Sequence, residues 1–476
     1  MIMKNGRYDL IIIGGGAAAF SAAIKANRHG VKTAMIERAM LGGTCVNVGC
    51  VPSKNLLGAG EILHSAKHPS YPSVFSCDSD FDFAKTIESK DALVRGLRKQ
   101  KYYDVLQSLE HVELVQADAS FVSPKKVKIV DDDGRLFEAD KFIIATGSSP
   151  SVPRFKGIEN MQYLTNNGAL ALKEKPSSMI VIGGRALGLE FAQMYARFGA
   201  KVTLLQRSDR IIPDHEPEIS QGLHQHLTEE EGIEIITDVN VREVWQKNGS
   251  KFVRASVKNK EERVFEAEQL LMATGRRPNT ADLHLENAGV KLRDDGAIIV
   301  NSEMRTSASH IWAGGDVVGE PMLETLAAKA GATAAENALT GGHKKIDLLS
   351  VPSAVFTSPQ VASVGMTEEQ MMQKYGYCSC RTLLMKDVPK ALTVNDTRGL
   401  IKMAVDPKKN NRIVGVHILA SIAADMIHEA VVAVKYRLTI DDIIDTVHVF
   451  PTMSEAIKLV ATAFKQDVSK LSCCAE

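Results

Sequence analysis

The stretch Asp9–Ala19, which reads DLIIIGGGAAA, decides the fold. Its apolar first half is typical of a buried parallel strand, because such strands are covered on both faces. A helix-like segment, Phe20–His29, follows the small residues, and a second apolar strand, Val31–Ile36, leads to Glu37. Strand, glycine turn, helix, strand and acid in this order predict a dinucleotide-binding βαβ unit.

Each marked position of this unit has a physical task. Gly14 permits a tight turn, and Gly16 lets the backbone approach a pyrophosphate. The small side chain of Ala19 lets the helix pack closely on the strand. The carboxylate of Glu37 accepts hydrogen bonds from a ribose hydroxyl.

The same pattern recurs further along the chain. The strand Met179–Ile182 precedes the turn Gly183–Gly188, a helix runs through Arg197, and a strand Lys201–Leu205 follows. In both units 23 positions separate the first glycine from the residue that ends the second strand, here Gln206. The sequence therefore predicts two dinucleotide sites.

The second unit differs from the first in its charges. Arg185 replaces the second glycine, and Gln206 replaces the acid, with Arg207 and Arg210 close behind. Loss of the carboxylate removes repulsion of a 2′-phosphate, and guanidinium groups pair well with phosphate. This favours NADPH over NADH; the alternative is that both arginines belong to a solvated loop face.

Three further turns follow apolar strands. Ala145-Thr146-Gly147 and Ala273-Thr274-Gly275 are similar turns, which we interpret as returns of the chain between two nucleotide domains. The strand ending Ala313-Gly314-Gly315-Asp316 is of the same kind.

Composition limits the class of protein. The chain has 476 residues, which suggests two to four domains, and its 57 basic residues balance 57 acidic ones. Zero net charge argues against nucleic acid as the main partner, and no apolar run approaches the ~20 residues of a membrane span, so no membrane insertion is expected. Seven cysteines are too sparse for a secreted disulfide scaffold. We expect a cytoplasmic, multi-domain protein in which any cysteine pairing is catalytic or metal-directed.

One cysteine pair lies just after the first acidic strand end. The segment Gly42–Lys54 contains Gly43, Thr44, Cys45 and Cys50, and no further paired ligands suited to structural zinc lie nearby. A redox-active dithiol, activated by a helix N-terminus and by Lys54, explains the pair best. Cys378 and Cys380 would share one face of a strand, where we expect packing or exposure rather than metal binding.

The segment Gly42–Lys54, the two glycine units and Ala313–Asp316 together resemble the flavoprotein disulfide reductases, the FAD-dependent pyridine nucleotide-disulfide oxidoreductase family. The resemblance covers essentially the whole chain. It implies an α/β fold with two Rossmann-like, three-layer nucleotide-binding domains and a C-terminal α+β dimerisation domain. The expected division is FAD binding at 1–152 and 273–345, NADPH binding at 153–272, and dimerisation at 346–476, with a Cys-Cys tail.

The resemblance also implies roles for individual residues. Cys50 would face the flavin and Cys45 would be the exchanging thiol, while Lys54 would pair with Glu190 beside the flavin. Asp316 would bind the ribityl chain, Ala119 would contact the adenosine, and the backbone near Glu324, opening a helix, would stabilise the reduced flavin. The residues expected to contact FAD or NADPH are Gly14, Gly16, Ala19, Glu37, Gly43, Thr44, Lys54, Ala119, Thr146, Gly147, Gly183, Gly188, Arg207, Arg210, Gly275, Asp316 and Glu324.

The C-terminal region points to the substrate. Disulfide-reducing members place an acid–base histidine directly before a proline, where this sequence has Phe450, with Glu455 retained and His448 two positions earlier. Phenylalanine carries no proton for a leaving thiolate. The chain ends with Cys473-Cys474-Ala475-Glu476, and thiolates prefer soft metal ions.

These features resemble the mercuric-ion-reducing members of the family. By that resemblance, Cys473 and Cys474 of one subunit of a homodimer catch Hg(II) from a thiol complex and pass it to Cys45 and Cys50 of the other, beside Tyr102. Many members carry a small N-terminal metal-binding domain, whereas this sequence starts almost at the first strand. We therefore expect delivery by small thiols, by another protein or directly to the tail.

Two other hypotheses remain. The protein reduces a small organic disulfide, as dihydrolipoamide dehydrogenase or glutathione reductase does, or it is a flavoprotein that only sequesters soft metal through its cysteines.

Overall fold

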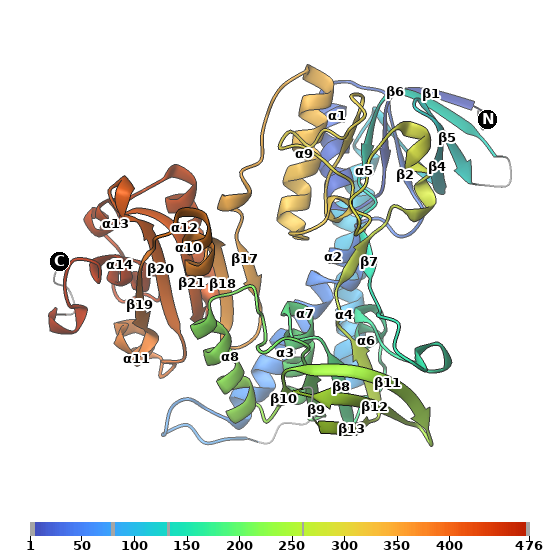
Figure 1. Cartoon of the computed structure of the whole chain (residues 1–476). Coiled ribbons are helices and arrows are strands. Elements are labelled where there is room, and N and C mark those ends of the chain that lie inside the picture. The colour runs from blue at the N-terminus through green and yellow to red at the C-terminus, as the bar shows by residue number, and fades with distance from the viewer. Residues whose placement is uncertain (1–4, 78–80, 131–133, 259–260, 473–476) are drawn as a thin grey trace. The chain divides into compact units, whose positions relative to one another are not determined.

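The computed structural model describes residues 5–77, 81–130, 134–258 and 261–472 (Figure 1). The chain forms two compact units. Unit 1 comprises Met1–Pro52, Glu88–Val152 and Thr274–Asp347, and unit 2 comprises Ser53–Ile87, Pro153–Ala273 and Leu348–Glu476. Within the described ranges, no helix has both the length and the apolar character that crossing a membrane requires.

Unit 1 contains a sheet with the order β3-β2-β1-β6-β5-β4, in which β16 also pairs with β6. The first pairings (β1 with β2, β2 with β3, β1 with β6) are parallel, whereas β4, β5 and the first half of β6 form an antiparallel meander. The strands are β1 (Asn5–Ile13), β2 (Thr33–Glu37), β3 (Val112–Gln116), β4 (Asp118–Ser123), β5 (Lys126–Val130), β6 (Leu136–Ile144) and β16 (Ile311–Ala313). The predicted glycine unit is therefore present: β1, a turn, α1 (Ala17–Arg28) and β2.

Helix α1 packs against the alanine-rich helix α9 (Glu324–Thr340). Alanines of both helices are fully buried and share one core cluster, which allows a close approach of the two helices. At the crossing, a Cβ on Gly331 would overlap the backbone carbonyl of Ala18. This contact holds α9 close to α1.

Two short strands lie just after the glycine turns that the sequence singled out. β7 (Ser148–Pro150) follows Gly147 and β15 (Arg276–Pro278) follows Gly275, and the two strands pair antiparallel. The expected returns of the chain are thus joined by hydrogen bonds within unit 1. The other helices before β3 are α2 (Gly43–Val48), α3 (Cys50–Lys67), α4 (Phe83–Arg98), the π-helix η1 (Lys99–Tyr103) and α5 (Asp104–Gln107).

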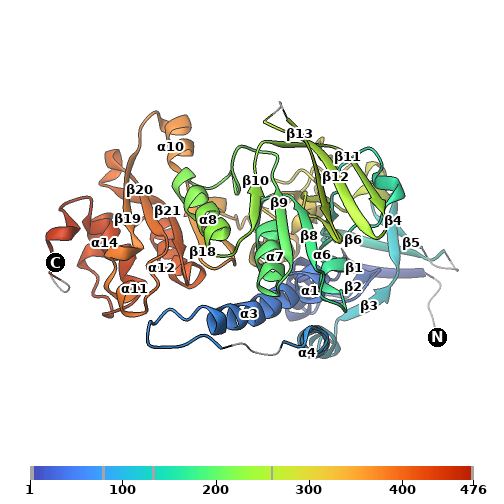
Figure 2. The same ribbon diagram turned by 90° about the horizontal axis from the view of Figure 1, so that it is seen from below.

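Unit 2 contains a parallel sheet with the order β10-β9-β8-β14. Its strands are β8 (Ser178–Ile182), β9 (Lys201–Leu205), β10 (Glu234–Ile236) and β14 (Gln269–Met272). Helix α7 (Ala186–Arg197) packs on β8 and β9, and the antiparallel strands β11 (Val239–Lys247), β12 (Ser250–Val257) and β13 (Glu261–Ala267) contact the same sheet (Figure 2). This is the second predicted glycine unit in a layered α/β arrangement.

The C-terminal part of unit 2 is an antiparallel sheet with the order β17-β18-β21-β20-β19. Its strands are β17 (Ser353–Val355), β18 (Gln360–Gly365), β19 (Ser379–Leu384), β20 (Leu400–Asp406) and β21 (Arg412–Ala420). The helices around it are α10 (Glu368–Tyr375), α11 (Pro389–Thr393), α12 (Ala423–Tyr436), α13 (Ile440–Asp445) and α14 (Glu455–Thr462). Apolar side chains of β20, β21, α12 and α14 form its core.

The parallel and antiparallel sheets of unit 2 share a core. Leu419 and Val361 belong to the same buried cluster as Leu223 of α8 (Pro217–Glu229) and Phe191 of α7. The shorter elements of the chain are α6 (Asn166–Leu170) and the 3₁₀ turns η2 (Ile158–Asn160), η3 (Ala281–Leu283), η4 (Leu285–Ala288), η5 (Asp316–Val318), η6 (Leu348–Ser350), η7 (Met385–Asp387), η8 (Pro407–Lys409) and η9 (Val468–Lys470). Two layered α/β parts and a C-terminal α+β part agree with the predicted fold class.

The contact between α1 and α9 provides a test of the fold. We expect Gly331→Ala to lower the stability of the protein by about 1–3 kcal/mol, because the added methyl group overlaps a buried carbonyl and the helices must separate. Gly96→Ala in α4 is the matched control: nothing lies within 4 Å of its Cβ, and we expect a gain of about 0.5–1 kcal/mol. Thermal unfolding of both variants checks this, and equal effects would contradict it.

Candidate active site and nucleotide-binding sites

The two cysteines of the predicted dithiol lie on consecutive helices. Cys45 is in α2, Gly49 ends that helix, and Cys50 is the first residue of α3. Both are present as thiols; Cys45 is half-buried and Cys50 is exposed. Gly49 separates the two helices, and a side-chain hydrogen bond joins Cys45 and Cys50 across this break.

The pKa of Cys45 is raised well above that of an ordinary thiol. The largest cause is a hydrogen bond with Cys50, followed by burial and by the negative charges of Cys50 and Glu324. A hydrogen bond raises the pKa of its donor, so Cys45 keeps its proton and Cys50 is the acceptor. The direction of this shift favours Cys45 as the donor of the hydrogen bond and Cys50 as its acceptor.

The carboxyl group of Glu324 is a functional candidate that the sequence did not indicate; only the backbone at this position was expected to act. Glu324 opens α9, and its carboxylate accepts a hydrogen bond from Cys45. Burial raises the pKa of Glu324, and the nearby charge of Asp316 adds to the shift. A carboxyl group with a raised pKa beside a thiol is suited to accept the thiol's proton. No signal near Glu324 in the sequence connects it with Cys45.

Tyr102 lies beside the same dithiol, on the π-helix η1. Burial, then the charges of Glu324 and the two cysteines, raise its pKa to about 12, so its hydroxyl stays protonated at neutral pH. The ring packs edge-on against Phe20 of α1, with the centroids 4.8 Å apart. The short π-helix is a known feature of functional sites, and here it places the predicted tyrosine at the thiols.

Arg276 supplies a positive charge to this part of unit 1. Its guanidinium donates to Ser148 Oγ (2.7 Å) and to Thr44 Oγ1 (3.3 Å), and it lies 3.8 Å from Asp316. Burial lowers the pKa of Arg276 overall, whereas the charge of Asp316 and, to a smaller extent, that of Cys50 stabilise the charged guanidinium. The interaction with Cys50 is mutual, so Arg276 favours the thiolate form of Cys50.

A cavity of about 570 Å³ in unit 1 contains several residues predicted for FAD. Gly14, Glu37, Ala119 and Thr146 line it. Gly14 has a φ of +125°, and a Cβ there would overlap the carbonyl of Ala145, so only glycine allows this turn.

The residues around this cavity fit the adenine dinucleotide of FAD. Helix α1 begins after Gly16 without a side-chain cap, which leaves its first N–H groups to a pyrophosphate. Ala19 is fully buried in the helix packing. Burial raises the pKa of Glu37, whose carboxylate accepts from the N–H groups of Ala39 (2.6 Å) and Gly15. The carboxylate is thus fixed at the cavity wall for a ribose.

The other residues predicted to contact FAD lie in turns and helix starts of unit 1 and are joined by hydrogen bonds or close packing. Asp316 opens η5 and accepts from Ser148 Oγ at 2.6 Å. Thr146 Oγ1 donates to the carbonyl of Asn279 (2.8 Å), whose amide donates back to the carbonyl of Thr146 (2.9 Å). Gly43, at the start of α2, lies against Gly16. Asn279, which also lines the cavity, was not singled out from the sequence.

Lys54 and Glu190 form an ion pair, with 2.6 Å between Lys54 Nζ and Glu190 Oε2. Glu190 comes from α7 and its side chain is only 6% exposed. Its other oxygen accepts from the N–H of Phe356 (3.0 Å), and the Lys54 ammonium lies 4.6 Å from the centre of the Phe356 ring. The structure brings together the pair that the resemblance implied and fixes both partners.

The turn of the second glycine unit repeats the first. Gly183 has a φ of +116°, below the carbonyl of Ala273, and Gly188 packs closely on Gly183. Gln206 Oε1 accepts from the N–H of Gly184 (2.8 Å), the bond that Glu37 makes with Gly15 in unit 1. Glutamine therefore keeps the turn while removing the negative charge.

The arginines near this turn are placed differently from one another. Arg185 pairs with Asp214 at the surface (2.6 Å). Arg210 donates to the carbonyl of its own loop at Pro213 (2.8 Å), whereas Arg207 is exposed. Arg207 is therefore the better placed of the two predicted phosphate ligands.

His448 lines a cavity of unit 2 and is hydrogen-bonded on both ring nitrogens. Its Nε2 lies 2.8 Å from Glu429, and its Nδ1 bonds the carbonyl of Thr446 (2.9 Å). Phe450 and Glu455 line the same cavity of about 510 Å³ in unit 2. Burial raises the pKa of Glu455. Cys473 and Cys474, predicted metal ligands, lie outside the described residues.

Cys378 and Cys380 are joined by a disulfide. From the sequence we expected Cys378 and Cys380 to be packed or exposed thiols. Their shared strand face was foreseen, but the spacing alone gave no sign of oxidation.

Comparison with known families agrees with this geometry. Residues 8–331 match the model of the pyridine nucleotide-disulphide oxidoreductases, and residues 351–461 match the dimerisation domain of the same enzymes. The chain belongs to the pyridine nucleotide-disulphide oxidoreductase family. Membership implies FAD and NAD(P)H as cofactors and indicates a homodimer.

Full-length relatives of this oxidoreductase are mercuric reductases. The enzyme of Staphylococcus aureus is 43% identical over 99% of this chain and 85% of its own length. The enzyme of Streptomyces lividans is 40% identical, with 100% of both chains covered. Among solved structures, the Cu(II) complex of the HOCl-induced flavoprotein disulfide reductase RclA from Escherichia coli has a TM-score of 0.86 and 29% identity, over 97% of this chain and 100% of that one.

The hydrogen bond between Glu324 and Cys45 gives a testable shift. Because Glu324 raises the pKa of Cys45, we expect Glu324→Gln to lower it and to speed alkylation of Cys45 at a fixed pH. A decrease of one unit gives about tenfold more thiolate. The pH dependence of iodoacetamide labelling at Cys45, followed by mass spectrometry, measures this. Glu138→Gln, at a surface ion pair on β6, should leave the profile unchanged; an unchanged or raised pKa in Glu324→Gln would refute the assignment.

Proposed function

We propose that this protein is an NADPH-dependent mercuric reductase, which reduces Hg(II) to Hg(0) at the dithiol of Cys45 and Cys50. The observation that carries the proposal is this asymmetric, charge-supported dithiol in a chain whose full-length relatives, at 40–43% identity, are mercuric reductases. The reaction belongs to mercury detoxification, and we place it in the cytoplasm, where NADPH and small thiols are available.

The cofactor residues are proposed from the turns and cavities of each unit. FAD would lie along Gly14, Gly16, Glu37 and Ala119, where the uncapped start of α1 and a carboxylate are ready for a pyrophosphate and a ribose. The turn Gly183–Gly188 would hold NADPH in unit 2. When bound, the flavin would supply two electrons from the nicotinamide, first to a Cys45–Cys50 disulfide and then to the Hg(II) that the two thiolates hold.

The chain's own residues then handle the metal and the protons. Hg(II) binds two thiolates, so Cys45 must lose the proton that it donates to Cys50. Glu324, already bonded to Cys45 and with a raised pKa, accepts that proton. Arg276 favours the thiolate at Cys50. Two electrons reduce the bound Hg(II) to Hg(0), which leaves, and both sulfurs again carry the electron pairs that held it.

Phe450, at the position of the family's acid–base histidine, argues against the disulfide-reductase alternative. Cleavage of an organic disulfide needs a proton donor for the leaving thiolate. Phe450 has no proton to give, and both nitrogens of His448 are engaged by Glu429 and Thr446. Hg(II) reduction needs no such donor, because the product leaves as a neutral atom.

Cys473 and Cys474 are proposed as the entry ligands for Hg(II), delivered from one subunit of the homodimer to Cys45 and Cys50 of the other. The dimerisation domain at residues 351–461 supports the dimer. Thiolate exchange at successive cysteine pairs would move the ion without releasing it to water.

A mercury assay tests the function. We expect Hg(II)-dependent NADPH oxidation in excess thiol with release of Hg(0) vapour, its loss by at least a hundredfold in Cys45→Ser, and a large loss in Cys473→Ala/Cys474→Ala when Hg(II) arrives as a bulky thiol complex. Cys77→Ser, which removes an exposed cysteine, is the control and should retain full activity. Faster turnover of lipoamide or glutathione disulfide would favour the reductase of small disulfides. NADPH oxidation in proportion to metal, without vapour, would favour sequestration.

The nucleotide preference is tested at Arg207. If its guanidinium binds the 2′-phosphate, Arg207→Ala should raise the KM for NADPH about 10–100-fold, as loss of a charged hydrogen bond does, and leave the KM for NADH nearly unchanged. Arg242→Ala, another exposed arginine of unit 2, is the control. Steady-state kinetics with both nucleotides decides; equal changes for NADPH and NADH would show that Arg207 is only a surface residue.

A further inference from the structure

The disulfide between Cys378 and Cys380 lies at the edge of the C-terminal sheet of unit 2. Cys380 is on β19, which ends the order β17-β18-β21-β20-β19, and Cys378 lies just before this strand. Residues two apart on a strand point to the same face. Reduction of the bond would therefore leave two thiols side by side, and both residues are partly exposed to solvent.

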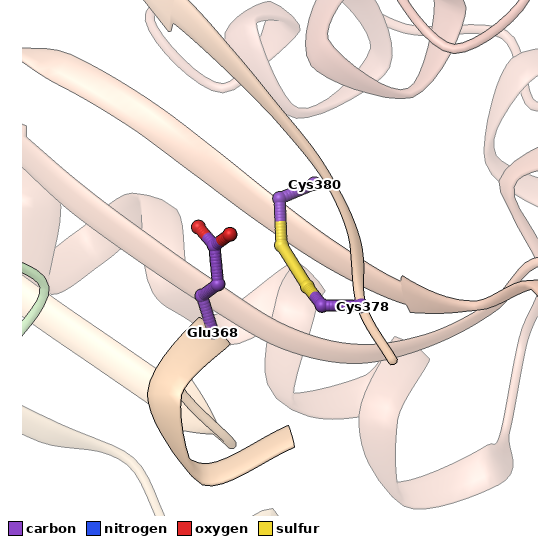
Figure 3. Close-up of side chains that lie close together, drawn as sticks. All are labelled: Glu368, Cys378 and Cys380. Carbon is purple, nitrogen blue, oxygen red and sulfur yellow. A yellow bond between two sulfur atoms is a disulfide. The ribbon is translucent and has the colours of Figure 1, made fainter. Parts of the chain in front are cut away.

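A third ligand atom lies beside the sulfurs. A carboxylate oxygen of Glu368, from the first turn of α10, and the two sulfurs all lie within 4.8 Å of one another (Figure 3). The side chain of Glu368 is 47% exposed, so an ion from solvent has access to it. The two sulfurs come from residues around the start of β19 and the oxygen comes from α10.

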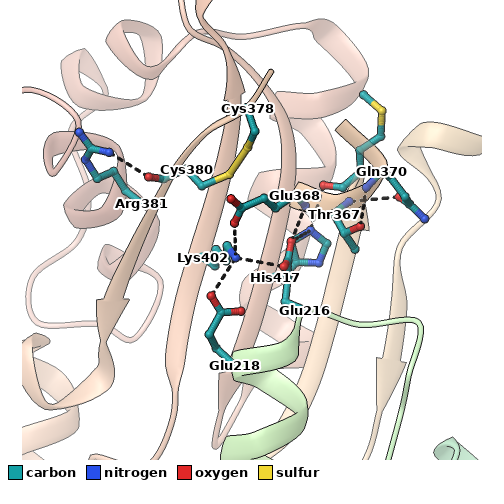
Figure 4. The surroundings of a disulfide bond; sticks show 11 residues. Glu216, Glu218, Thr367, Glu368, Gln370, Cys378, Cys380, Arg381, Lys402 and His417 are labelled. Atoms are coloured by element: carbon teal, nitrogen blue, oxygen red, sulfur yellow. Dashed lines mark hydrogen bonds and ion pairs between the residues drawn. A yellow bond between two sulfur atoms is a disulfide. The ribbon is translucent and has the colours of Figure 1, made fainter. Parts of the chain in front are cut away.

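The charges around this group favour a cation. Lys402 Nζ lies 3.0 Å from Glu216, 2.9 Å from Glu218 and 2.7 Å from Glu368 (Figure 4). One ammonium thus faces three carboxylates, and burial lowers the pKa of the neighbouring His417, which adds no positive charge at neutral pH. Lys402 pairs with Oε2 of Glu368, so Oε1 can bind a cation while the ion pair is kept.

The guanidinium of Arg381, next to Cys380 in the sequence, contacts backbone carbonyls and an aromatic ring. Arg381 donates to the backbone carbonyls of Cys380 (2.9 Å) and Ala463 (3.2 Å), and it stacks over the ring of Phe464. The guanidinium is thus positioned by two backbone carbonyls and by a cation–π contact.

We propose that Cys378, Cys380 and Glu368 form a second binding site for a thiophilic divalent cation, closed by the disulfide and opened by reduction. The site is separate from the dithiol of Cys45 and Cys50, and it does not depend on the proposed reductase activity.

The opening step is a thiol–disulfide exchange. Two molecules of a small thiol are oxidised to one disulfide, the bond between Cys378 and Cys380 breaks, and each of the two sulfurs gains one electron and one proton. On binding, both thiols release their protons and the two thiolates and the Glu368 carboxylate hold the ion, so two protons leave per cation.

Cadmium titration of the full-length, FAD-loaded protein tests the site. The parent and Cys378→Ser/Cys380→Ser are reduced with dithiothreitol, freed of it under anaerobic conditions and titrated with Cd(II) alone, followed by the ultraviolet absorption of the cadmium–thiolate bond. We expect the reduced parent to bind one more Cd(II) per chain than the double variant, with no such difference before reduction. Equal numbers after reduction, or an extra ion already bound before it, would overturn the proposal.

Two further variants separate a built site from a mere count of cysteines. Cys77→Ser removes one exposed thiol elsewhere and should bind as many ions as the parent. Glu368→Gln should keep the number of ions but weaken binding of the additional one about tenfold. Loss of an ion in Cys77→Ser, or unchanged affinity in Glu368→Gln, would contradict the three-ligand site. The basal mercury activity of the Cys378→Ser/Cys380→Ser variant should be unchanged.

Discussion

The architecture depends on a close approach of backbone to backbone at two glycine turns. Gly14 lies below the carbonyl of Ala145, and Gly183 lies below that of Ala273, with positive φ at both glycines. Any Cβ at these positions would push the following helix away from its sheet. This constraint places the uncapped helix starts next to Glu37, at the end of β2, and Gln206, just after β9, so the two glycine turns have the same geometry.

The chemistry of the dithiol depends on asymmetry of charge rather than on burial alone. The Cys45 thiol is hydrogen-bonded with Cys50 and with Glu324, and both interactions raise the pKa of Cys45. The positive charge of Arg276 interacts favourably with negative charge on Cys50. One sulfur is thus ready to carry charge and the other to give up a proton when a metal arrives.

The sequence predicted those features that covalent spacing determines. Gly14 and Glu37 follow from the period of a strand, turn and helix, and the similarity of the segment Gly42–Lys54 to a known motif located the dithiol and Lys54 together with Glu190. Contacts that no recognised motif encodes were not predicted: nothing near Glu324 or Arg276 in the sequence indicates that they interact with Cys45 and Cys50. For the same reason the spacing of Cys378 and Cys380 predicted a shared face but not a bond.

The two cysteine pairs of the described chain differ in the way that their surroundings treat negative charge. At Cys45 and Cys50 a guanidinium and a carboxyl group with a raised pKa support one thiolate and one protonated thiol, which suits a sulfur pair that repeatedly exchanges electrons and metal. At Cys378 and Cys380, the carboxylate of Glu368 lies beside the sulfurs and belongs to a group of three carboxylates around Lys402. This negative charge destabilises two thiolates when no cation is bound, and it stabilises a cation that binds to them. The first environment therefore favours turnover, and the second favours either a closed disulfide or a bound ion.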